Sequence, residues 1–178
     1  MIHQYCFDAL CKNGLECNGL DLELSKLSLD KYLIQNKLDY YEATRLVMCL
    51  GIQVSALQEI NKSVLFVQPT DIIRLNSDWF VLTESAKISD ITDSNMIRII
   101  EPLSFLNNDN VPLELKNIKE LPAYIPIGCG YYSIAQLIIT AMKLSLPINT
   151  SIISGTSLHY FMERCMIKDP ALRQYVFI

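Results

Sequence analysis

The chain has 178 residues, of which 51% are hydrophobic and 19% are charged, and its formal net charge is −4. This length fits one domain with a sizeable core, and the composition excludes a disordered chain. The acidic balance, without a stretch rich in Lys and Arg, argues against nucleic acid as a partner.

The sequence has neither a complete secretory signal nor an uninterrupted apolar stretch that would span a membrane as a helix. The stretch MIHQYCFDAL lacks the basic and apolar parts of a secretory signal. The uncharged stretch 121–142 is long enough to cross a membrane, but Pro122 and Pro126 interrupt its first half and favour a buried core helix. We therefore expect no membrane partner and a cytoplasmic protein.

The six cysteines are expected to be reduced thiols, because no secretory signal is visible and the chain can form its own core. A zinc site near the amino terminus is disfavoured, since its ligands lack a tight Cys-x2-Cys pair. Those ligands would be His3, Cys6, Cys11 and Cys17. We expect neither a metal nor a cofactor.

The first elements along the chain are helices after an irregular start. The pattern of residues 1–27 predicts short strands or loops, and we expect these residues to form a short segment of their own. SLDKYLIQNK (28–37) predicts a short helix with Ser28 as its cap. The stretch 38–60 predicts the clearest helix, because apolar residues recur at helical spacing after a capping box made by Asp39 and Glu42.

The middle of the chain favours β-structure and then a long loop. SVLFV (63–67), IIRL (72–75) and WFVLT (79–83) predict strands, and the turn triplet at 76–78 joins the last two in a hairpin. A loop then extends to about Glu120, broken by one strand at MIRII.

The last part of the chain is helical again. YYSIAQLIITAMKL (131–144) is apolar on nearly all sides and predicts a buried central helix. SLHYFMERCMI (157–167) predicts a helix with one apolar face. The expected fold is therefore mainly α with a small β-hairpin.

This order of elements resembles the large lobe of protein kinases. ERCMIKDPALR (163–173) is similar to the Cys-Leu-x-x-Asp-Pro-x-x-Arg pattern that ends that lobe, and YYSIAQLI (131–138) to its VWSLGVLL helix. PTDIIRLNSDWFVLT (69–83) resembles the family's PENILL hairpin, and LSLDKYL (27–33) the helix after the hinge. The likeness covers residues 22–178 in order, and it extends to divergent kinase-like proteins of large DNA viruses.

The resemblance implies a helical domain like the kinase large lobe over residues 28–178, with 1–27 as a remnant of the hinge or of a hairpin. The small lobe is expected to be missing, because no G-x-G-x-x-G loop precedes Lys12.

The catalytic positions implied by the resemblance carry residues that cannot transfer a phosphoryl group. Phe66 stands where the family has its base, and Gln68 where it has a lysine. Asp71 and Glu84 stand at the metal-binding positions and are weak candidates for Mg²⁺. Without base, lysine and glycine loop, we expect no serine/threonine kinase activity and no catalytic residue.

The supporting positions are better retained. Glu114 and Arg173 stand where the family forms a buried ion pair, whereas Gly130 replaces the aspartate that opens the central helix. We therefore expect a non-catalytic, pseudokinase-like interaction or scaffold domain. Its partner, another protein or a second copy, would bind the surface that faces nucleotide in kinases, where Phe66 and Val67 are expected to be open.

Two alternatives stay open. A truncated kinase relative could still bind nucleotide and Mg²⁺ through Asp71 and Glu84, with weak or no phosphotransfer. Alternatively, the likeness to kinases is accidental, and the chain is a helical domain of another kind.

Overall fold

A computed structural model describes residues 1–16, 26–75, 79–106, 111–144 and 153–177. In chain order its elements are α1 (Gln4–Lys12), β1 (Lys26–Ser28), α2 (Leu29–Gln35), α3 (Tyr40–Glu59), β2 (Lys62–Phe66), the 3₁₀ turn η1 (Pro69–Asp71), β3 (Ile72–Leu75), β4 (Trp79–Leu82), β5 (Lys87–Asp90), β6 (Met96–Ile99), α4 (Leu113–Lys116), β7 (Ala123–Pro126), α5 (Gly128–Met142), α6 (Ser157–Cys165) and the 3₁₀ turn η3 (Pro170–Leu172).

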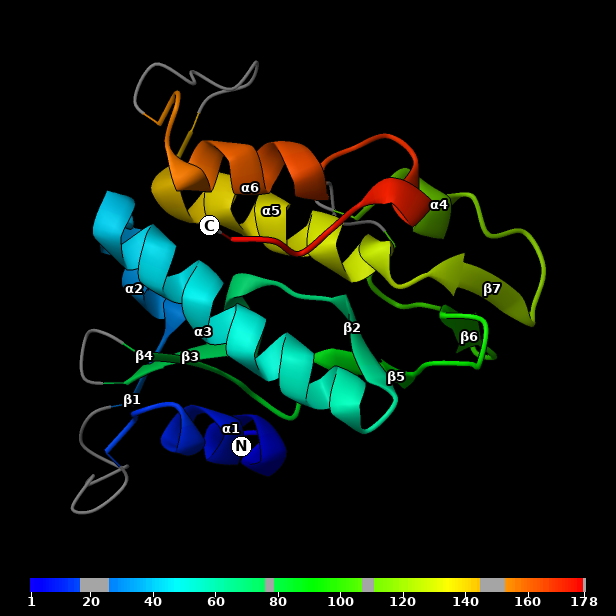
Figure 1. The fold of residues 1–178 in the computed structure, drawn as a ribbon, viewed down its shortest axis with the longest axis horizontal. Coiled ribbons are helices and arrows are strands. Elements are labelled where there is room, and N and C mark those ends of the chain that lie inside the picture. Colours follow the sequence, from blue (N-terminus) through cyan, green and yellow to red (C-terminus); the bar gives the residue numbers. More distant parts are fainter. Residues whose placement is uncertain (17–25, 76–78, 107–110, 145–152, 178) are drawn as a thin grey trace.

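The fold is mixed α/β. In the described residues, a three-stranded sheet and two two-stranded sheets lie among the helices (Figure 1). The prediction of a mainly α domain with a small hairpin is therefore wrong. The missed strands are each three or four residues long, which is too short for a period-two pattern to stand out.

The strongest local signals in the sequence correspond to real elements. The capping box of α3 is confirmed, because Glu42 N–H donates to Asp39 Oδ1 at 2.8 Å and Asp39 N–H donates to Glu42 Oε2 at 3.0 Å. The hairpin is confirmed by antiparallel pairing of β3 with β4, from Ile72–Leu82 to Leu75–Trp79. Its predicted turn, 76–78, lies outside the described residues. Ser28 occupies the cap of α2, but its side chain makes no capping hydrogen bond.

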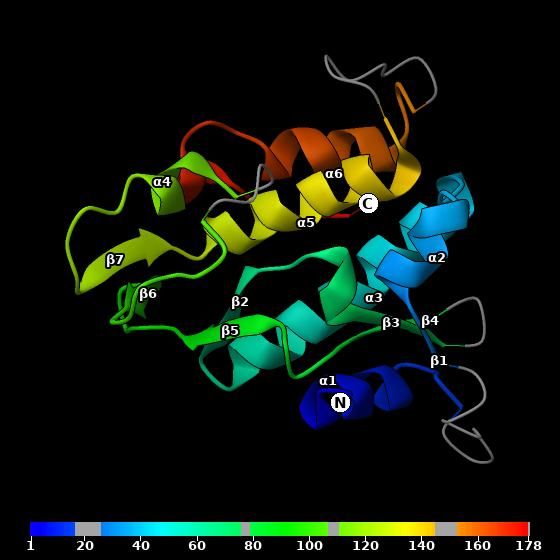
Figure 2. The same ribbon diagram turned by 180° about the vertical axis from the view of Figure 1, so that it is seen from behind.

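The central helix is also confirmed. Most side chains of α5 are buried, and the helix packs between α6 and β2 (Figure 2). It begins at Gly128, earlier than predicted. At Gly130 a Cβ atom would lie 2.0 Å from the carbonyl oxygen of Val64 in β2. A glycine is required there because the backbone of β2 occupies the space of a side chain.

The amino-terminal segment belongs to the same core. Residues Gln4–Lys12 form helix α1, not the predicted strands or loops. Its buried residues Cys6 and Leu10 pack in the main core, and the helix contacts α3 and β4. The apolar face of α1 covers little more than two turns, so its periodicity is faint in the sequence.

The cysteines differ from the prediction at one position. Within the described residues, Cys6, Cys49, Cys129 and Cys165 are buried and form no disulfide. Cys11, in contrast, is disulfide-bonded. The expectation of reduced cysteines is therefore wrong for Cys11.

Candidate functional site

Phe66, which the resemblance to kinases places at the position of the base, and the neighbouring Val67 are buried. Phe66 and Val67 are only 1% and 2% exposed. The Phe66 ring stacks on Phe105 with 4.7 Å between centroids, and Val67 N–H donates to Ser133 Oγ at 3.2 Å. The predicted open apolar surface at these two residues is therefore wrong, because the chain after β6 returns to cover Phe66.

Asp71 acts as a structural acceptor beside this position. The residue is 3% exposed, and its Oδ1 accepts a hydrogen bond from Ser85 Oγ at 2.7 Å. Its Oδ2 accepts from the N–H of Gln68 at 3.1 Å, and its main-chain oxygen accepts from the N–H of Thr83 at 2.9 Å. Oδ1 and the main-chain oxygen thus hold η1 against the segment that follows β4, whereas Oδ2 caps η1 itself.

Glu84, the other candidate for a metal, is exposed, and its N–H donates to the Met1 carbonyl oxygen at 2.9 Å. In the described part of the chain, no group of three or more His, Cys, Asp or Glu side chains could hold a metal ion. Of the disfavoured zinc ligands, Cys17 lies outside the described residues, and His3 Nδ1 accepts from the N–H of Cys6 as the cap of α1.

The structure brings Glu114 and Arg173 together as an ion pair. The Arg173 side chain is 3% exposed and that of Glu114 is 15% exposed. Arg173 Nε also donates to the carbonyl oxygen of Ile167 at 2.7 Å, and its guanidinium lies 4.8 Å from the centroid of the Tyr132 ring. The pair therefore ties α4 to α5 and to the turn that follows α6.

Cys129 lies at the start of α5, close to this pair. Burial and, to a smaller extent, the nearby Glu114 carboxylate raise the pKa of the Cys129 thiol to about 12. A thiol that stays protonated is a poor nucleophile and a poor metal ligand. Cys129 is therefore a core residue.

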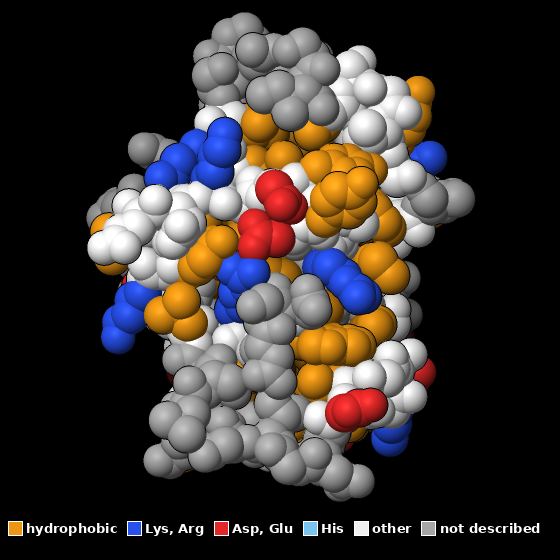
Figure 3. All heavy atoms as spheres, turned by 90° about the vertical axis from the view of Figure 1, so that its left-hand side faces the viewer, with side chains coloured by type: hydrophobic (Ala, Val, Ile, Leu, Met, Phe, Trp, Pro, Cys, Tyr) orange, Lys and Arg blue, Asp and Glu red, His pale blue; other side chains and the backbone are white. Residues whose placement is uncertain are grey.

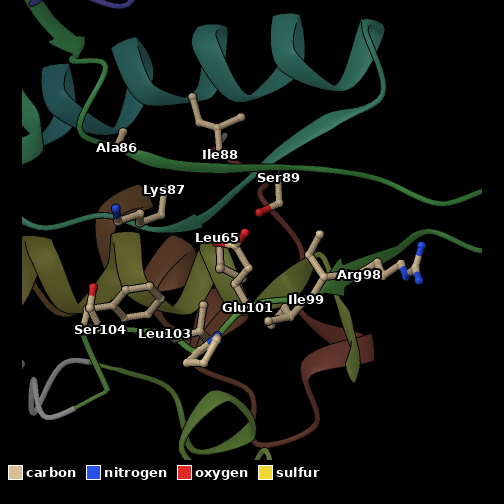
Figure 4. Close-up of a pocket in the computed structure, with 13 residues that line it drawn as sticks. Leu65, Ala86, Lys87, Ile88, Ser89, Arg98, Ile99, Glu101, Leu103 and Ser104 are labelled. Carbon is tan, nitrogen blue, oxygen red and sulfur yellow. The ribbon is translucent and has the colours of Figure 1, made fainter. Parts of the chain in front are cut away.

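Two neighbouring hollows lie on the surface next to Phe66 and Phe105. One, of about 500 Å³, is lined by polar side chains that include Gln68, Asp71 and Ser85. The other, of about 430 Å³, lies between β5 and the chain that follows β6 (Figure 4). The two share Lys87, Ser104 and Phe105 as lining residues.

The cations of the second hollow, which we call the β5–β6 hollow, are available to a ligand. Lys87 and Arg98 line it and are exposed. Neither of them takes part in the ion pairs found among the described residues. Sequence reasoning missed both as site residues, because Lys87 lies in a stretch read as a loop. No period-two pattern indicated a strand there, because Ser89 and Asp90 are consecutive polar residues.

The opposite end of the molecule is different. Figure 3 shows acidic, basic and apolar side chains interspersed on that face, without a broad patch of one sign among its described atoms. Arg74 there pairs with Glu42 at 2.5 Å and lies 4.3 Å from the centroid of the Tyr32 ring. These charges serve packing between α2, α3 and β3.

Comparison with protein-family models and with curated protein sequences found no match for this chain. In the described part of the chain, none of the helices has the length and apolar character needed to cross a membrane.

Proposed function

We propose that this chain is a non-catalytic, kinase-like domain that binds another protein at the face formed by the two hollows. The use of Asp71 carries the proposal. Both oxygens of this carboxylate accept hydrogen bonds from within the chain, from Gln68 N–H and Ser85 Oγ. Asp71 is also only 3% exposed, so this carboxylate supports the wall of a hollow and is poorly accessible to a metal–phosphate group.

The neighbouring residues support the same reading. Phe66 has no group that accepts a proton, and its ring is stacked under Phe105. The Glu114–Arg173 pair supports kinase-like scaffolding without the chemistry. Partner binding is supported by exposed Lys87 and Arg98, which have no carboxylate partner among the described residues. We also propose an intracellular location, which the buried thiols of Cys6, Cys129 and Cys165 support, since none of them is in a disulfide.

The first test asks whether the protein binds nucleotide. The melting temperature of the purified protein is followed while ATP and Mg²⁺ are titrated, since a ligand of the native state must raise it. Phosphotransfer from ATP to a generic protein acceptor is assayed in parallel. We expect no shift and no transfer. A saturable rise would favour the truncated, nucleotide-binding relative instead.

The second test concerns the partner. The protein is cross-linked in cells that express it, as wild type, as Lys87→Glu and as Lys31→Glu. Lys31 is an exposed lysine of α2, at the far end of the molecule from β5, and serves as the matched control (Figure 1). We expect proteins that are recovered with the wild type and the control but lost with Lys87→Glu. Recovery that never depends on Lys87 would contradict the proposed face.

A further inference from the structure

β5 and β6 are neighbouring strands that do not continue as one sheet. In the described residues, β5 pairs only with β2, and β6 pairs only with β7. A single bridge between Ile91 and Ile97 connects the two sheets, next to a hydrogen bond from Thr92 N–H to the Met96 carbonyl oxygen at 2.8 Å. Beyond this bridge the strands separate, and the β5–β6 hollow opens between them (Figure 4).

The main chain of β5 presents a free edge to the hollow. Ile91 N–H donates to the Asn61 carbonyl oxygen at 2.8 Å, which makes this pair a hydrogen-bonded one. Since hydrogen-bonded and non-hydrogen-bonded pairs alternate in antiparallel strands, the peptide groups of Ser89 face β2 and those of Ile88 face away from it. Figure 4 shows the Ile88 side chain directed away from the hollow that this residue lines. Its main chain is therefore the part available to a ligand.

Charged side chains mark the two ends of the hollow. Lys87 lies toward one end and Arg98 toward the other, and Glu101 lies between them (Figure 4). An acidic group at either end would meet a cation that has no ion-pair partner among the described residues, whereas an acidic group in the centre would meet Glu101. The lining thus favours a ligand with negative charge at its ends and none in its middle.

We propose that an extended segment of a partner protein adds to the free edge of β5 as a further strand, with acidic residues at the positions near Lys87 and Arg98. An unpaired strand edge is a template for such pairing, in which main-chain hydrogen bonds give affinity and side chains give specificity. The inference rests on the proposed function and specifies how its partner is bound.

Other occupants fit the lining less well. A second copy of the chain would bring the same two cations to the hollow, so like charges would meet. A helix laid along the hollow has its interior main-chain groups paired within itself, so they cannot pair with the peptide of Ile88. A nucleic-acid backbone carries evenly spaced negative charge and would place phosphates against Glu101.

The test uses four synthetic peptides labelled for fluorescence polarisation. One has Asp at both ends of an alternating Val–Thr segment. The second has Lys at both ends, the third has an additional central Asp, and the fourth is the first with alternate amides N-methylated. We expect the first peptide to bind and each of the others to bind at least about tenfold more weakly, which corresponds to about 1.4 kcal/mol.

Protein variants locate the site. Lys87→Glu and Arg98→Glu are each expected to weaken the first peptide at least about tenfold, whereas Lys31→Glu leaves it unchanged. Hydrogen exchange distinguishes strand pairing from simple attraction between charges. Saturation with the peptide should slow exchange of the Ile88 amide, because strand pairing would protect this amide and charge attraction alone would not.

Each outcome decides the inference. Equal binding of the N-methylated peptide, or no binding by any peptide, would overturn strand addition. Equal binding of the Lys-ended peptide would overturn the role of Lys87 and Arg98. A dimer in sedimentation velocity that Lys87→Glu dissociates would replace the partner by a second copy. If cellular partners depend on Lys87 but no peptide binds, only strand addition fails; if neither is observed, the proposed function fails as well.

Discussion

The Glu114–Arg173 pair and the β5–β6 hollow show opposite uses of charge. The pair is almost fully buried, and Arg173 also donates to the main chain at Ile167. In the hollow, Lys87 and Arg98 are exposed and pair with no carboxylate of the described residues. The first arrangement fixes elements in place, whereas the second leaves cations available to another molecule.

The packing around the two regions differs in the same way. Near the pair, Gly128 lies so close to η3 that a Cβ atom would be 2.2 Å from the Pro170 carbonyl oxygen. Around the hollow, β5 and β6 separate after one bridge. Stability should therefore be concentrated near the pair and binding near the hollow. Substitutions in the two regions should therefore differ in their effect on the free energy of unfolding.

The largest effect on stability is expected from Arg173→Ala. Removal of Arg173 leaves the Glu114 carboxylate and the Ile167 carbonyl without their donors in a largely buried site. The free energy of unfolding should fall by about 3–5 kcal/mol, measured by urea denaturation. The control is Lys62→Ala, which removes an exposed ion pair with Asp90 and should cost less than about 1 kcal/mol. Equal losses in both variants would contradict the division.

A somewhat smaller loss is expected from Gly130→Ala. The new Cβ atom would meet the backbone of Val64 and not a flexible side chain, so α5 and β2 must move apart. Overpacking of this kind costs about 1–3 kcal/mol. Gly14 offers a control in which a Cβ atom meets nothing within 4 Å, although its φ of 106° adds backbone strain. A Gly130→Ala protein as stable as the wild type would show that β2 is not held against α5.

The sequence predicted the parts of the fold that depend on local patterns. The Asp39–Glu42 box, the stripe of α3 and the apolar helix α5 are each specified within one short stretch of chain. The missed strands β5 and β7 have four residues each and are stable only through pairing with distant segments. Propensity carries no information about such pairing, so the mixed α/β class was not predicted.

The candidate site was predictable to a smaller extent. The resemblance to kinases suggested Glu114 and Arg173, which do form a pair. It also placed Phe66 on an open surface, and this failed because Phe105, far along the chain, stacks on it. The availability of Lys87 depends on the separation of β5 from β6, which no local pattern in the sequence encodes.

The core around Cys129 should make stability depend on pH. Burial raises the pKa of this thiol from 9.0 to about 12, so the folded protein keeps a proton that the unfolded chain loses above about pH 9. Stability from this group is complete below pH 9 and decreases as the pH rises toward 12. Cys129→Ser has no thiol to titrate at this position. The free energy of unfolding of the wild type, relative to that of Cys129→Ser, should therefore fall by about 1.4 kcal/mol per pH unit between about pH 9 and about pH 12.

Urea denaturation at about pH 8 and about pH 10 measures this difference. The buried thiols Cys6 and Cys165 also have raised pKa values, and they remain in both proteins. Their contribution therefore cancels in the comparison. A constant difference between wild type and Cys129→Ser across the two pH values would contradict burial of this thiol in the native state.

The smallest effect on stability is expected where the effect on binding is largest. Lys87→Ala and Arg98→Ala remove exposed side chains that form no ion pair with the described residues, so the free energy of unfolding should change by no more than about 0.5 kcal/mol. A loss above 1 kcal/mol for either variant would mean that its cation supports the fold, as Arg173 does. Retained stability together with lost partner binding would show that these charges serve recognition, since no stabilising contact is then left to account for them.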